Sequence, residues 1–102
     1  MRVVKPSTIK AYGRQHPDAD SSLRGWLKAT IDAEWMSLQH ARDMFPNADG
    51  VKVKSGRTVT VFNICGNKYR LVVAIHYNSG KVYVLRFMTH AEYDKEKWKE
   101  QL

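Results

Sequence analysis

The spacing of apolar residues changes near Pro46, and the change divides the chain into a helical part and a strand-rich part. Before Pro46 the apolar residues recur every three or four positions, which predicts the buried face of a helix. The helix is expected to begin at the cap candidates 20–22, and its stripe continues past a break near Ser37. The stripe consists of Leu23, Trp26, Leu27 and Ile31, followed by Trp35, Leu38, Ala41 and Phe45.

Two shorter elements are predicted ahead of this helix. Val3 and Val4 favour a short first strand. Pro6 and Ser7 favour a helix that ends near His16, because the proline at position 17 disfavours helical backbone in the residue before it.

Residues 47–89 alternate between apolar and polar side chains and are rich in β-branched residues. Turn signals at 55–56, 66–67 and 78–80 divide this segment into three or four antiparallel strands. The chain is therefore expected to form one α+β domain over residues 1–102. Two or three N-terminal helices would pack on one face of the sheet, and a short helix would end the chain.

A hairpin with loop 78–80 sets the register of the last two strands. It places Tyr77 opposite Lys81, and hence Val72 opposite Arg86 and Arg70 opposite Met88. The odd positions of 69–75 and 83–87 then form the apolar face under the helices. The even positions form a second face that is expected to be open to solvent. On this second face Arg70 and Arg86 lie diagonally, close enough for both side chains to reach one ligand. Lys68 is expected on this face as well.

The stretch THAEYD, residues 89–94, follows the last predicted strand. Thr89 and Glu92 have the spacing of a capping box, which predicts a final helix beginning at His90. Helical geometry groups Ala91, Trp98 and Leu102 on a side that docks on the fold, and His90, Tyr93 and Lys97 on a different side. Asp94 lies one turn after His90, where it can hydrogen-bond the ring and fix its tautomer or form only a solvated side-chain pair.

The chain carries 17 Lys and Arg against 10 Asp and Glu, a formal charge of +7. This excess suits a polyanionic partner such as nucleic acid or an acidic protein segment, although a merely solvated basic surface has the same charge. Lys52, Lys54 and Arg57 surround the 55–56 turn and form a basic ribbon that can follow a nucleic-acid backbone or remain solvated.

The composition argues against several other classes of protein. No apolar stretch has the 18 or so residues of a membrane span, and the first ten residues lack a secretory core, so we expect a cytoplasmic protein with no membrane partner. Cys65 is the single cysteine, which fits a reducing compartment. The four histidines show no metal-ligand spacing, and we expect neither a metal nor another cofactor.

Two arginines, a lysine, a histidine and a tyrosine on one surface have the chemistry needed to cleave RNA without a metal. The 2′-OH must lose a proton, the phosphorane gains negative charge, and the leaving 5′-oxygen must gain a proton. Arginine suits the phosphate because its planar fork binds two oxygens and stays charged near neutral pH.

The stretches FNICGNKYRLVV and KVYVLRFMTHAEYDKEKW resemble the HigB family of bacterial toxins, the toxin halves of type II toxin-antitoxin modules in the RelE-like superfamily. HPDADSSLRGWL and MFPNADGVKV extend the resemblance over nearly the whole chain. The resemblance implies helices on one face of an antiparallel sheet, and an endoribonuclease that cuts messenger RNA on the translating ribosome.

By position, the resemblance also implies roles for individual residues. Arg70 and Arg86 would hold the phosphate, with added charge from Lys68, while His90 serves as base or acid. Tyr93 would position the nucleotide, and Asp94 would orient His90 or assist proton transfer. The remaining RNA-binding candidates are Lys52, Lys54, Arg57 and Lys97.

The resemblance further implies a helix-turn-helix antitoxin of the HigA type, encoded beside the toxin. Operator DNA would be bound only through the complex with that antitoxin. The alternative is a noncatalytic basic module that binds RNA or protein.

Overall fold

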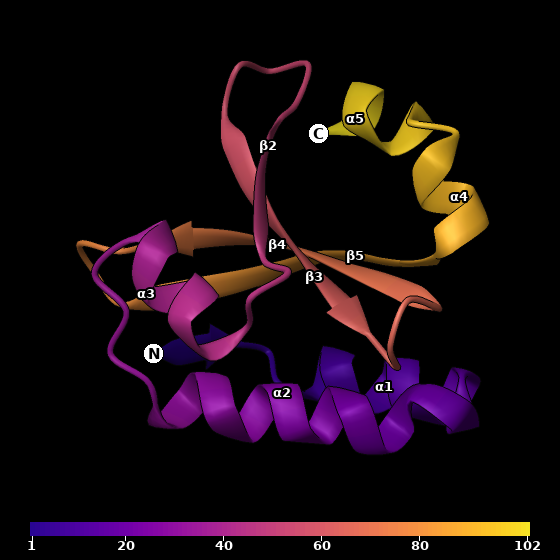
Figure 1. The fold of residues 1–102 in the computed structure, drawn as a ribbon, viewed down its shortest axis with the longest axis horizontal. Helices are drawn as coiled ribbons and strands as arrows, with labels where there is room; N and C mark the ends of the chain where they lie inside the picture. The colour runs from indigo at the N-terminus through magenta and orange to yellow at the C-terminus, as the bar shows by residue number, and fades with distance from the viewer.

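The computed structural model describes all of residues 1–102 and contains a sheet between two groups of helices (Figure 1). In chain order the elements are β1 (Arg2–Val4), α1 (Ser7–Gln15), the 3-10 segment η1 (Pro17–Ala19), α2 (Asp20–Asp32), α3 (Leu38–Met44), β2 (Asp49–Lys52), β3 (Thr58–Ile64), β4 (Tyr69–His76), β5 (Lys81–Thr89), α4 (His90–Asp94) and α5 (Lys97–Gln101). The predicted α+β class is confirmed.

The sheet has five strands in the order β1-β5-β4-β3-β2. The last four strands pair in antiparallel fashion, but β1 lies parallel to β5, with Val3 beside Val82. The expectation of three or four strands, all antiparallel, is therefore corrected to a mixed sheet of five. The strand that makes the sheet mixed is β1, the short first strand predicted at Val3 and Val4, and it buries Val3 against the main core.

Helices α1 and α2 cover one face of the sheet, as predicted (Figure 1). Leu23, Trp26 and Leu27 of α2 are buried there, but Ile31 is 48% exposed and Thr30 is buried in its place. At about 100° per residue, position 30 lies within the arc of these three residues, whereas position 31 lies at its margin.

The second face of the sheet is not open, contrary to the sequence-based expectation. Helices α4 and α5 lie over part of it, on the side opposite α1 and α2 (Figure 1). Trp98 of α5 is only 5% exposed and completes a second core cluster. The other members of that cluster are Val53, Val59, Val61, Val72 and Met88.

The C-terminal segment is two short helices and not one. Glu96 between them adopts a left-handed conformation with φ of 60°, which ends the first helix. The predicted capping box of Thr89 and Glu92 is present. Tyr93 packs against the second cluster and Ala91 is exposed, so the predicted division of the helix into docking and free sides is wrong for these two residues.

The register between β4 and β5 agrees with the prediction where it matters for the site. Val72 lies opposite Arg86, and Arg70 lies opposite Met88. The hairpin itself differs, because His76 and not Tyr77 faces Lys81, and a bulge near Val72 restores the register. Between the hairpin turn and the bulge the face assignment of three residues changes. Val84 packs against the helix-covered cluster and Leu85 against the second one, while Tyr83, predicted under the helices, is exposed opposite Ala74.

None of the helices combines the length and apolar character that crossing a membrane would require.

Replacing Trp98 with alanine tests whether the C-terminal segment is part of the folded core. Loss of this buried ring should lower the free energy of unfolding by about 3–5 kcal/mol, measured by urea denaturation. Lys97→Ala, next to it and exposed, should change the same quantity by no more than about 0.5 kcal/mol. Equal stability of the two variants would show that α5 does not pack on the sheet.

Candidate active site and nucleic-acid interface

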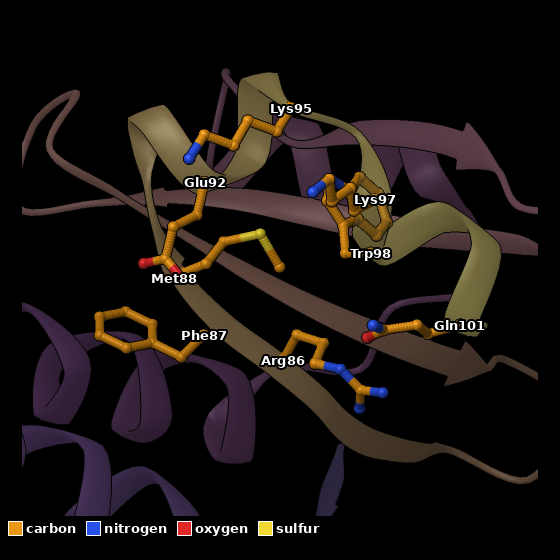
Figure 2. A pocket seen from close by; sticks show the side chains of 8 residues that line it. All are labelled: Arg86, Phe87, Met88, Glu92, Lys95, Lys97, Trp98 and Gln101. Atoms are coloured by element: carbon orange, nitrogen blue, oxygen red, sulfur yellow. The ribbon is translucent and has the colours of Figure 1, made fainter.

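A pocket of about 330 Å³ opens between β5 and the two C-terminal helices (Figure 2). Figure 2 shows Arg86 entering from the strand, and Lys95 and Lys97 from the helices, around Met88 and Trp98. The lining residues are Arg86, Phe87, Met88, Glu92, Lys95, Lys97, Trp98 and Gln101.

The charges of this pocket are predominantly positive, with three cations and one carboxylate in the lining. Arg86, Lys95 and Lys97 form no ion pair with any carboxylate of the chain. The single acid of the lining, Glu92, is occupied in the capping box, where it accepts hydrogen bonds from the N–H and hydroxyl of Thr89 at 3.2 and 3.1 Å. Three free cations above an apolar floor make a site for an anionic group such as a phosphate.

Arg86 projects from a part of β5 with a free edge. Strand β1 pairs only with Lys81 to Tyr83, so no strand lies outside the later residues of β5. One guanidinium N–H donates to the carbonyl of Leu85 at 2.8 Å, which leaves the other donors available. Its charge also acts on Tyr12 of α1. Burial raises the pKa of that hydroxyl, and Arg86 opposes part of the rise.

Arg70 shares a sheet face with Arg86, as predicted, but the expectation that both face solvent is wrong for Arg70. It is only 8% exposed. Its guanidinium donates to the side-chain oxygen of Asn67 at 2.6 Å and to the carbonyls of Asn67 and Tyr69 at 3.0 and 3.1 Å. The group also lies 5.6 Å from the ring centroid of Tyr93. Arg70 therefore joins the β3–β4 turn to α4 and does not line the pocket.

Tyr93 lies between Arg70 and Trp98. Its ring stacks on Trp98 with centroids 5.2 Å apart, and the indole N–H of Trp98 donates to the carbonyl of Tyr93 at 3.1 Å. Burial raises the pKa of the Tyr93 hydroxyl, and the negative charge of Asp49 adds to the rise. This tyrosine is thus a neutral, packed side chain with a polar end.

His90 and Asp94 form the pair that the sequence suggested. His90 Nδ1 lies 2.7 Å from Asp94 Oδ2, and both side chains are partly exposed. Since a carboxylate only accepts, the ring carries its proton on Nδ1 and leaves Nε2 free to accept another.

The His90–Asp94 pair does not line the pocket. At about 100° per residue, the pocket residues Glu92 and Lys95 point in a direction roughly 150° from that of the His90–Asp94 pair, measured around the axis of α4. The two candidate groups therefore lie on different sides of one short helix.

The other predicted cations lie outside the pocket, except Lys97. The expectation that Lys68 shares a face with Arg70 and Arg86 is wrong, because Lys68 pairs with Asp18 of η1 in the helical layer. The Asp18 carboxylate also accepts from the hydroxyl of Tyr69 at 2.9 Å. These hydrogen bonds from Lys68 and Tyr69 lower the pKa of Asp18. The predicted basic ribbon, Lys52, Lys54 and Arg57, is exposed in the β2–β3 hairpin.

Sequence reasoning missed Lys95, Glu92 and Gln101 as pocket residues. A single continuous final helix was assumed, and in such a helix Glu92 and Lys95 are neighbours but Gln101 points to a different side. The left-handed residue Glu96 breaks that continuity, and nothing in the local sequence signals it. No group of His, Cys, Asp and Glu side chains has an arrangement that could hold a metal ion.

The two arginines should respond differently to truncation. Arg70→Ala removes buried, charge-assisted hydrogen bonds and should lower the free energy of unfolding by about 1.5–3 kcal/mol. Arg86→Ala, which removes one bond at a half-exposed position, should change it by no more than about 0.5 kcal/mol. Thermal or urea unfolding measures both, and a larger loss for Arg86 would contradict the assignment of Arg70 to the scaffold.

Comparison with known proteins identifies the family. The family model described as HigB_toxin, RelE-like toxic component of a toxin-antitoxin system, matches residues 19–96. The chain is 26% identical over 94 residues to the mRNA interferase toxin HigB of Escherichia coli K12, covering 92% of this chain and 88% of that protein. The mRNA interferases HigB of Escherichia coli O157:H7 and Shigella flexneri match to the same extent. Since the family model spans most of its length, the chain belongs to the HigB family of RelE-like toxins.

Proposed function

We propose that this chain is a metal-independent endoribonuclease that cleaves messenger RNA on the translating ribosome and thereby arrests translation. The observation that carries the proposal is the pocket with three unpaired cations, Arg86, Lys95 and Lys97, in a chain whose relatives are named mRNA interferases. Cleavage would proceed by attack of the 2′-OH on the adjacent phosphate.

Arg86 is the group proposed to hold the scissile phosphate. Its free donors can bind two phosphate oxygens, and its charge stabilises the negative charge that the phosphorane gains. Lys95 and Lys97 bind the same or a neighbouring phosphate as point charges. Tyr93 stacks on Trp98, which lines the pocket, and Arg70 in turn contacts the ring of Tyr93. These contacts hold Trp98 in place.

His90 is the group proposed to transfer protons, with Asp94 fixing its tautomer. Nε2 of the neutral ring can take the proton of the 2′-OH or, once protonated, give one to the leaving 5′-oxygen. Because His90 follows β5 directly, an RNA strand that leaves the pocket along the edge of β5 passes the first turn of α4. The predicted basic ribbon would contact the backbone farther away.

The proposal includes a partner that controls the site. As the toxic component of a toxin-antitoxin system, the chain would be held inactive in the cytoplasm by a helix-turn-helix antitoxin of the HigA type. An acidic segment of that antitoxin would compete with RNA for the unpaired cations. Operator DNA would be contacted through the antitoxin in this complex.

Primer extension on a message after brief induction in cells tests the proposal. Arg86→Ala should slow cleavage by about 100- to 1,000-fold, and His90→Ala by about 100- to 10,000-fold, since each removes one stabilising or proton-transferring group. Lys28→Ala, an exposed residue on α2, is the matched control and should cleave as the unaltered chain does. A translation inhibitor should abolish the cuts if the ribosome is required.

The outcome that would contradict this scheme is full growth arrest and unchanged cleavage by both the Arg86 and the His90 variants. Cleavage that persists under the translation block would remove only the ribosome from the proposal.

The basic ribbon should contribute to the affinity for RNA but not to the rate of the cleavage step. Replacing Lys52, Lys54 and Arg57 together with glutamine should reduce the slope of log affinity against log salt by up to about 2, given roughly 0.7 per phosphate contact on single-stranded RNA. The rate of cleavage at saturating RNA should not change. An unaltered salt slope would mean that the hairpin does not touch RNA.

A second candidate function is a noncatalytic module that binds RNA or protein through its basic surface. It is favoured by one observation, the position of the His90–Asp94 pair outside the pocket. Purified protein that binds RNA tightly but leaves ribosome-bound message intact would support this alternative.

A further inference from the structure

The turn between β3 and β4 has a conformation that needs support from outside itself. It spans residues 65–68, and both Cys65 and Gly66 adopt left-handed backbone, with φ of 56° and 64°. Two left-handed residues in succession suit a tight hairpin turn, but a residue with a side chain, such as Cys65, is disfavoured there. Contacts from other elements must therefore help to hold this turn.

Asp18 of η1 supplies these contacts on the side of the helical layer. Its carboxylate accepts from the ammonium of Lys68 and from the hydroxyl of Tyr69, the latter at 2.9 and 3.1 Å for its two oxygens. The backbone carbonyl of Asp18 accepts from the thiol of Cys65 at 3.3 Å. One residue thus binds the start of the turn, its last residue and the first residue of β4.

The opposite side of the same turn holds the start of α4. The carbonyl of Lys68 accepts from the N–H of His90 at 3.0 Å. The first N–H groups of a helix have no acceptor within the helix, so this bond fixes the residue that begins α4. In Figure 1 the turn accordingly lies between the end of α1 and α4. Lys68 thus contacts Asp18 through its side chain and His90 through its backbone.

We infer that Asp18 is a positioning residue for His90, acting through Lys68 and the β3–β4 turn. The inference rests on the proposed function, in which His90 transfers protons, and it extends the site to the helical layer on the other side of the sheet. Ionised Asp18 holds the turn, and the turn places the imidazole relative to the phosphate pocket.

A positioning role and a purely structural role predict different outcomes. Asp18 and Lys68 are both solvent-exposed, and exposed ion pairs contribute little to stability. A displacement of about 1 Å at a reacting group, by contrast, can slow a reaction by about 100-fold. Removing the Asp18 charge should therefore reduce cleavage far more than it reduces stability.

The experiment compares cleavage of ribosome-bound message by four variants of the full chain. Asp18→Asn should cleave about 100-fold more slowly at unchanged RNA affinity. The matched control, Asp32→Asn, removes another exposed pair, that with Lys28 on α2, and should cleave normally. The double variant Asp18→Asn with His90→Ala should be no slower than His90→Ala alone, because Asp18 acts only through His90.

A second measurement does not depend on activity. Hydrogen exchange of the His90 amide, followed by nuclear magnetic resonance, should be about 2- to 10-fold faster in Asp18→Asn and unchanged in Asp32→Asn. This readout reports directly on the bond between His90 and Lys68.

The inference is overturned if Asp18→Asn cleaves as Asp32→Asn does, if it slows the His90→Ala variant further, or if exchange at the His90 amide is unaltered. Absence of cleavage by the unaltered chain would instead overturn the proposed function, while the exchange measurement would still decide whether Asp18 positions His90.

Discussion

One extra residue in β5 decides where the key cation of the site lies. His76 pairs with Lys81 at the start of the hairpin, and continuing that register without interruption would put Arg86 opposite Leu71. Leu71 is fully buried under the N-terminal helices, so the guanidinium would lose its hydration with no partner there. The bulge shifts the later part of β5 by one residue, which brings Arg86 opposite Val72 on the other face and turns Phe87 into the core.

The sheet is apolar on both faces, and this makes the C-terminal segment part of the fold. Helices α1 and α2 cover one face, and Trp98 with the residues around it covers a smaller area of the other. The break at Glu96 lets α4 follow the end of β5 while α5 turns back over the second cluster. The pocket is the space left beneath this bend, and for that reason it takes its cations from β5, from the junction between α4 and α5, and from α5.

The cations near the site fall into two groups. Those with a partner in the chain belong to the scaffold, and those without one are available to bind a ligand. Arg70 is occupied by Asn67 and Tyr93, and Lys68 by Asp18, so both serve to hold the β3–β4 turn. Arg86, Lys95 and Lys97 have no such carboxylate partners and keep their charge for a ligand.

Local sequence was sufficient for most of the secondary structure and for part of the site. Apolar spacing, the proline at position 17 and the capping box of Thr89 and Glu92 act over a few residues, and they correctly placed α1, the start of α2 and the start of α4. The pairing of His90 with Asp94 follows from one helical turn and was likewise predictable. Three features depended on the tertiary structure: the burial of Arg70, the bulge that places Arg86, and the convergence of Lys95 and Lys97 on it. Each of these features results from packing between segments that are distant in the chain. A local sequence pattern carries no information about that packing.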